Sequence, residues 1–132
     1  MAGPSISPHT SEAARALIRD TDQLALAVTE RLFRESPELL EKYGQRGYDK
    51  CLQDMRYNVE HLVPAVEMQD AGMFTRYVEW LDGLLRARNV PTTETLRCLE
   101  LLRNEVFVRY DRGEVDAINA ILDAGIAVVQ PK

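Results

Sequence analysis

The sequence predicts an all-α fold of six to seven helices. Apolar residues recur at three-, four- and seven-residue spacings along most of the chain, the pattern of helices with one buried face. No run of alternating apolar and polar residues is long enough to predict a sheet. Prolines, glycines and capping residues cut the apolar stretches into pieces of helical length.

The amino-terminal part begins with a leader rich in proline and serine, residues 1–10, which we expect to be flexible. From about Ser11 a first helix is predicted, because its apolar residues form one stripe. Ser36 and Pro37 start a new, short helix, since serine caps a helix and proline at the first helical position loses no hydrogen bond. This short helix is expected to end at Gly44. The stripe of the first helix consists of Leu17, Ile18, Leu24, Val28, Leu32 and Phe33.

The next helix is expected from about Tyr48 to Gln69, with a bend at Pro64, because proline removes one intrahelical hydrogen bond. Six or seven helices with short connections are typical of a globin-like fold or an irregular helical bundle. We therefore expect residues 11–132 to form a single globin-like domain. The remaining helices are predicted at Met73 to Arg88, from Thr92 or Thr93 to Gly113, and from Glu114 to Val129.

Length and charge narrow the classes of function. A chain of 132 residues suits one domain. Its 16 basic and 21 acidic residues are interspersed and give a net charge of -5, which disfavours binding to nucleic acid or to an anionic membrane. There is no secretory signal and no apolar run long enough to span a bilayer. We expect a cytoplasmic protein without nucleic-acid or membrane partners.

Enzymatic and heme-binding motifs are not found. The chain has two histidines, His9 and His61, and no phosphate-binding loop, zinc motif or nucleophile elbow. Cys51 and His61 would lie roughly 15 Å apart along one helix, too far for a nucleophile and its base. Heme globins need a proximal histidine, and the segment from Met73 to Arg88 has none. Neither an enzyme nor a heme protein is expected.

One helix face carries side chains with distinctive chemistry. Lys50, Cys51, Asp54 and Tyr57 follow one another at spacings that bring Cys51 and Asp54 to neighbouring positions. A thiolate can add to an activated double bond, a carboxylate can accept two pyrrole N–H groups, and a lysine can pair with a propionate. The alternative is a small buried cysteine beside an exposed aspartate. Cys98 is expected to be a structural residue, and both cysteines to be reduced thiols.

The segment CLQDMRY and the helix that follows it to Asp70 resemble the chromophore-bearing helix of the phycobiliproteins, the phycocyanin and allophycocyanin family. The motif of that family is a bilin-attachment cysteine, an arginine two residues later and an aspartate three residues later. The upstream run RLFRESPELLEKYGQRGYDKC is also similar, and the resemblance covers about residues 15 to 129. The amino-terminal helix pair of the family has no counterpart in a leader of about ten residues.

The resemblance implies a role for several residues. Cys51 stands where the family forms its thioether to the bilin, and Asp54 where a carboxylate bonds the central pyrrole nitrogens. Tyr57 matches an aromatic position near the chromophore. Gln53 occupies the position of the arginine that pairs with a propionate, and Glu60 replaces a basic residue. Propionate pairing would then fall to Lys50, Arg46, Arg56 or Arg86, while Tyr77 and Trp80 could flank the pigment.

The resemblance thus implies a non-enzymatic protein that handles, stores or senses a bilin, either biliverdin or phycocyanobilin, with noncovalent binding as an open option and no heme. A homodimer and contact with bilin-biosynthesis enzymes are the expected associations. The alternative is a non-heme, globin-type sensor or interaction domain that accepts a fatty acid, another apolar ligand or nothing. In that case the apolar and aromatic residues would simply line its interior: Phe74, Tyr77, Trp80, Leu81 and Leu84.

Overall fold

The computed structural model describes residues 8–131, and within this range the chain forms five α-helices and no strand. The first helix starts at Pro8, three residues before the predicted boundary at Ser11, and the rest of the predicted leader lies outside the described residues. The helices are α1 (Pro8–Glu35), α2 (Glu38–Met68), α3 (Ala71–Ala87), α4 (Thr92–Arg109) and α5 (Arg112–Val129).

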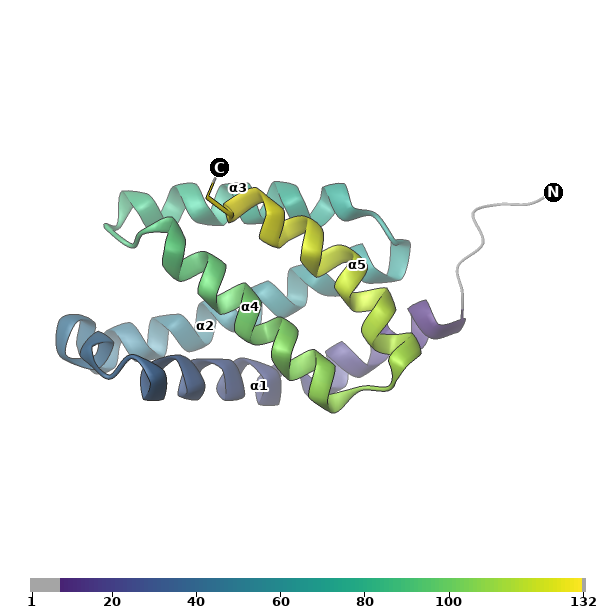
Figure 1. The fold of residues 1–132 in the computed structure, drawn as a ribbon, viewed down its shortest axis with the longest axis horizontal. Coiled ribbons are helices and arrows are strands. Elements are labelled where there is room, and N and C mark those ends of the chain that lie inside the picture. The colour runs from purple at the N-terminus through teal and green to yellow at the C-terminus, as the bar shows by residue number, and fades with distance from the viewer. Residues whose placement is uncertain (1–7, 132) are drawn as a thin grey trace.

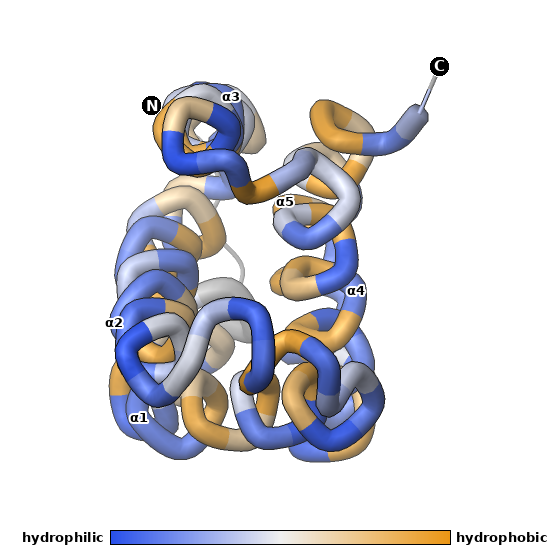
Figure 2. Tube along the Cα trace, turned by 90° about the vertical axis from the view of Figure 1, so that its left-hand side faces the viewer, coloured by the Kyte–Doolittle hydropathy of each residue, from blue (hydrophilic) through white to orange (hydrophobic). Residues whose placement is uncertain are grey.

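The helices pack in two groups joined by α4. In Figure 1, α1 and α2 lie side by side at the bottom, α3 and α5 lie at the top, and α4 runs obliquely between the two groups. Blue and orange alternate along the tube in Figure 2, as expected for helices that each bury one face. The apolar core between the groups is continuous and includes Leu24, Val59, Phe74, Leu99 and Leu122, all fully buried.

Five helices are described where six to seven were predicted, and the difference lies in α2. The predicted short helix and the helix after it are both part of α2, in which two helical segments meet at a kink at Gly44. Gly44 has φ 69° and ψ -172°, a conformation that strongly favours glycine. The predicted end of the short helix at Gly44 coincides with this kink. Pro64, where a bend was predicted, lies within α2, and the non-helical dihedrals of this helix are at Gly44 and not at Pro64.

Side-chain caps and a turn define the ends of the later helices. The Asp70 carboxylate accepts a hydrogen bond of 3.0 Å from the Gly72 N–H at the start of α3. At the start of α5 the Asp111 carboxylate accepts one of 2.9 Å from the Glu114 N–H. Beyond α3 the chain turns at Asn89, whose φ of 64° is left-handed. No helix in the described part of the chain is both long and apolar enough to cross a membrane.

Candidate functional site

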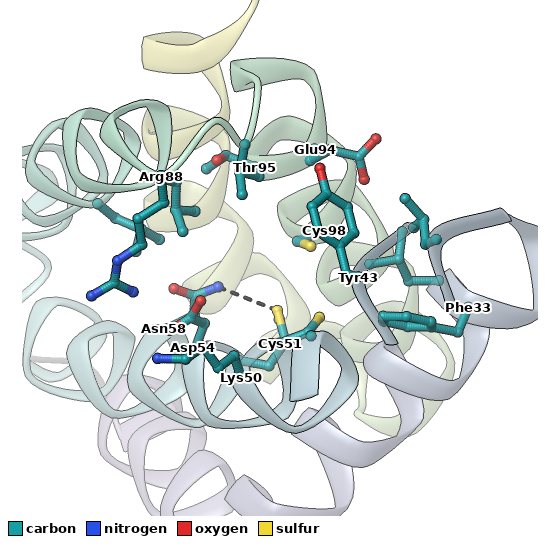
Figure 3. A pocket seen from close by; sticks show the side chains of 17 residues that line it. Phe33, Tyr43, Lys50, Cys51, Asp54, Asn58, Arg88, Glu94, Thr95 and Cys98 are labelled. Atoms are coloured by element: carbon teal, nitrogen blue, oxygen red, sulfur yellow. Dashed lines mark hydrogen bonds between the residues drawn. The ribbon is translucent and has the colours of Figure 1, made fainter. Parts of the chain in front are cut away.

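A cavity of about 230 Å³ opens between α2, the end of α3 and the start of α4, with α1 closing one end. Figure 3 shows this cavity with polar side chains entering it from several helices. The apolar part of its wall includes Leu32, Phe33, Leu39, Met55, Leu81, Leu85 and Val90. The polar and titratable part consists of Tyr43, Lys50, Cys51, Asp54, Asn58, Arg88, Glu94, Thr95 and Cys98.

The kink in α2 shapes the floor of the cavity. Tyr43 and Gly47 lie on either side of Gly44 and both line the cavity. A Cβ atom at residue 47 would overlap the Cβ of Tyr43, so the absence of a side chain allows this turn to close. The rest of α2 then presents Lys50, Cys51 and Asp54 to the same space, as their helical spacing predicts.

Cys51 lies part-buried on α2, with its sulfur 3.9 Å from the Thr29 hydroxyl of α1. Cys98 of α4 enters the cavity from the facing wall (Figure 3). The neighbouring Cys98 thiol lowers the pKa of Cys51 below its ordinary value, although burial opposes this change. A lower pKa increases the share of the thiolate, the reactive form of cysteine, relative to an ordinary cysteine.

Asp54 is the second chemically distinctive group of the wall. Burial raises the pKa of this carboxyl above its ordinary value, while the positive charges of Arg88 and Lys50 oppose the change. The two cations thus compensate only part of the cost of removing the carboxylate from water. A ligand that donates N–H groups to Asp54 would supply the remaining stabilisation.

A hydrogen-bonded pair fixes the wall behind Asp54. The Tyr77 hydroxyl of α3 donates to the Asn58 side-chain oxygen over 2.6 Å. The Asn58 amide donates in turn to the Met55 sulfur over 3.3 Å, the dashed line in Figure 3. Asn58 and Tyr77 are both buried. Tyr77 thus acts behind the cavity wall, by holding a residue that lines it.

Thr95 carries an unsatisfied hydroxyl. The residue is 3% exposed and lines the cavity from α4. Its Oγ1 atom is buried and has no hydrogen-bond partner in the described part of the chain. A buried hydroxyl without a partner is costly and uncommon in native structures, so it needs an explanation. A ligand group in the cavity would provide the missing partner.

The structure brings three of the predicted site residues together at the cavity, namely Lys50, Cys51 and Asp54. Arg56 instead forms an ion pair of 3.0 Å with Asp22, and Arg86 forms one of 3.1 Å with Asp82. Arg46 is exposed and does not line the cavity.

The predicted aromatic residues also lie away from the cavity lining. Tyr57 is 44% exposed and accepts a hydrogen bond of 3.4 Å from Gln53. Trp80 is 61% exposed on α3. His61 stacks on Tyr77 with ring centroids 4.1 Å apart.

Sequence reasoning missed the contributions of α3 and α4 to this site. Arg88, Glu94, Thr95 and Cys98 are far from Cys51 in sequence and reach it only through helix packing. The spacing of Thr95 and Cys98 did place them on one face of their helix. No signal in the sequence indicated that this face would oppose Cys51.

These features define an all-α protein with a partly polar cavity whose wall joins two thiols, two carboxylates and two cations. The chain matches the phycobilisome protein family over residues 7–129 and belongs to that family. Phycobiliproteins are non-enzymatic light-harvesting proteins, which agrees with the expectation that the chain is not an enzyme. Among curated proteins, no match was found.

Proposed function

We propose that the cavity binds a linear tetrapyrrole, a bilin, through Cys51 and Asp54. The observation that carries this proposal is that the two side chains share one wall of a single cavity. Membership in the phycobilisome protein family supports it, because that family typically binds bilin chromophores. The resemblance described above assigned the same two residues to chromophore attachment and to pyrrole binding.

The chain offers two different contacts to such a pigment. Cys51 supplies a nucleophile whose pKa is lowered, and Asp54 supplies a part-buried acceptor for pyrrole N–H groups. A bound bilin brings an electrophilic exocyclic double bond and an extended conjugated system. Addition of the Cys51 S–H across that bond forms one C–S bond and moves the proton to carbon, so no oxidant is needed.

The propionates of the pigment would meet Lys50 and Arg88. Both cations lie at the cavity and act electrostatically on Asp54. Gln53, which stands at the arginine position of the family motif, is exposed and outside the cavity lining. Arg88 can therefore take over the pairing with a propionate, because a guanidinium matches the planar geometry of a carboxylate.

The size and polarity of the cavity bear on how much of the pigment it holds. A volume of about 230 Å³ is below the roughly 300–1,000 Å³ of pockets that enclose drug-sized ligands. The cavity would enclose part of a tetrapyrrole and leave the rest across its open side. Thr95 offers an unpaired hydroxyl to the enclosed part. This arrangement fits a protein that holds a bilin for storage, transfer or sensing, and biliverdin or phycocyanobilin are the pigments to test first.

The test is a spectroscopic titration of the purified protein with biliverdin and with phycocyanobilin. We expect a sharpened, red-shifted long-wavelength band, because Asp54 stabilises an extended, protonated chromophore. Asp54→Asn should weaken binding by about 1.5–3 kcal/mol, the worth of a hydrogen bond to a charged group. This corresponds to roughly a tenfold or larger rise in Kd.

Two further measurements test the contacts of Cys51 and Asp54 with the pigment separately. Pigment that stays on the wild-type chain in a denaturing gel but not on Cys51→Ala would establish the thioether. Burial raises the pKa of Asp54, so this carboxylate should become protonated at a higher pH than an ordinary aspartate. On acidification, the affinity of the wild type for bilin should therefore begin to fall at that higher pH and should approach the affinity of Asp54→Asn. An unchanged spectrum with both pigments, together with tight binding of a fatty acid, would replace this proposal with the sensor-type alternative.

A further inference from the structure

Two consecutive residues of α4 bring polar groups to the cavity. Thr95 is 3% exposed, and its hydroxyl has no hydrogen-bond partner within the described residues. Glu94 is part-buried, and its carboxylate takes part in none of the ion pairs or side-chain hydrogen bonds of residues 8–131. Both residues line the cavity, on the wall opposite Cys51 and Asp54 in Figure 3. A ligand in the cavity therefore meets a hydroxyl and a carboxylate on neighbouring residues.

We propose that Thr95 and Glu94 bind a terminal lactam ring of the pigment. A lactam is a cyclic amide, so it carries a C=O acceptor and an N–H donor on neighbouring atoms. The Thr95 hydroxyl donates to the C=O, and the Glu94 carboxylate accepts the N–H. The inference rests on the proposed function, since a bilin has a lactam ring at each end, and it assigns one of these rings to the enclosed part of the cavity.

The charges of the cavity favour this placement. Lys50 and Arg88 both act on the Asp54 carboxylate, so the cationic part of the wall lies around that residue. A propionate is attracted to these cations and repelled by the Glu94 carboxylate. Glu94 instead favours a neutral group that donates a hydrogen bond. The lactam N–H of a terminal ring meets this demand, because the inner pyrrole N–H groups are taken by Asp54.

The position of Cys51 selects the ring that is bound. Glu94 and Cys51 lie close enough for the charge of one to act on the pKa of the other. In the proposed attachment, Cys51 bonds an exocyclic carbon of a terminal ring, so that ring lies between α2 and α4. The substituted carbons of such a ring lie opposite its nitrogen, so the N–H points to the wall that carries Glu94. Hydrogen bonds to α4 thus orient the electrophilic carbon toward the sulfur.

The test uses maleimide, a cyclic imide whose electrophilic double bond lies opposite its N–H group. The Cys51 S–H adds across this double bond, which forms one C–S bond and moves the proton to the neighbouring carbon. N-methylmaleimide has the same reactive bond without the N–H, and iodoacetamide alkylates the thiol without any ring. Mass spectrometry of the digested, fully reduced chain reports Cys51 separately from Cys98. Each rate is divided by the rate of the same reagent with glutathione.

Wild-type Cys51 should react with maleimide roughly three- to tenfold faster than with N-methylmaleimide, because only maleimide can donate a hydrogen bond to Glu94. Glu94→Gln keeps the size of the side chain and replaces a charged acceptor by a neutral one, so this ratio should fall roughly twofold or more. The ratio is the readout because loss of the Glu94 charge also lowers the pKa of Cys51 and speeds all three reactions.

Thr95→Val removes the donor to the C=O and should slow both maleimides roughly threefold relative to iodoacetamide, whereas Thr95→Ser should recover the rate. Thr93→Val changes an exposed residue of α4 outside the cavity lining, so this control should behave as the wild type.

Equal normalised rates of the two maleimides in the wild type would overturn the proposal. So would a ratio that Glu94→Gln leaves unchanged, since crowding by the methyl group would then explain it, or maleimide rates that do not respond to Thr95→Val. If a bilin binds while the ratios are flat, the proposed function stands without this inference. If the ratios change as expected and neither bilin binds, the lactam site stands and the proposed function fails.

Discussion

The two sides of α2 carry clusters of different character. On the side of the cavity, Cys51 and Asp54 belong to a wall with an unpaired hydroxyl at Thr95 and a carboxyl whose desolvation is only partly compensated. On the side of α3, the rings of His61, Tyr77 and Trp80 contact one another. These three residues are called the aromatic stack below, and the residues that line the cavity are called the cavity wall.

The aromatic stack is held by its own contacts. The His61 and Tyr77 rings are nearly parallel at 9°, and the Trp80 ring lies 6.1 Å from that of Tyr77. The His61 Nδ1 atom lies 2.9 Å from the Tyr57 carbonyl oxygen. Because these rings already contact one another, the stack contributes to packing. The cavity wall keeps capacity for partners that the chain itself does not provide, and this difference supports the proposal that the ligand binds at the cavity.

Tyr77→Phe should have the largest effect on stability, because it removes a buried hydrogen bond that links the two clusters. Removing the hydroxyl leaves the buried Asn58 oxygen without its donor at 2.6 Å. We expect the free energy of unfolding to fall by about 1–3 kcal/mol, measured by urea denaturation. Bilin affinity, compared at a temperature where both proteins are folded, should change less than it does in Asp54→Asn. A larger change would assign Tyr77 to the binding site itself.

Thr95→Val should separate stability from binding. Valine has nearly the shape of threonine and lacks the unpaired buried hydroxyl, so the pigment-free protein should gain about 1 kcal/mol in the free energy of unfolding. Bilin affinity should fall, because the enclosed part of the pigment loses a hydrogen-bond partner. Thermal unfolding with and without pigment measures both effects. Loss of stability in the pigment-free variant would show that the hydroxyl is satisfied in solution.

Trp80→Ala should have the smallest effect. Trp80 is 61% exposed and lies outside the cavity lining, so its loss should change the free energy of unfolding by no more than about 0.5 kcal/mol. The long-wavelength band of the pigment complex should keep its position. A shifted band would mean that the part of the pigment outside the cavity reaches α3, as the sequence-based prediction supposed.

Much of this molecule follows from local sequence. The apolar periodicity fixes the all-α class, and Gly44 and Asp70 mark a break and a helix start, because glycine alone adopts that backbone readily and a carboxylate caps free N–H groups. The spacing of Cys51 and Asp54 puts both on one face, because a helix turn takes 3.6 residues. The count of helices differs because the two helical segments that meet at Gly44 form the single element α2.

Only the tertiary structure decided which neighbours this face has. Arg88, Thr95 and Cys98 reach the cavity because α3 and α4 pack across α2, and that packing depends on core side chains spread over the whole chain. The same packing turns Tyr77 toward Asn58 and leaves Trp80 outside. Helical spacing specifies which residues share a face, whereas the burial of apolar surface by all five helices selects which faces meet.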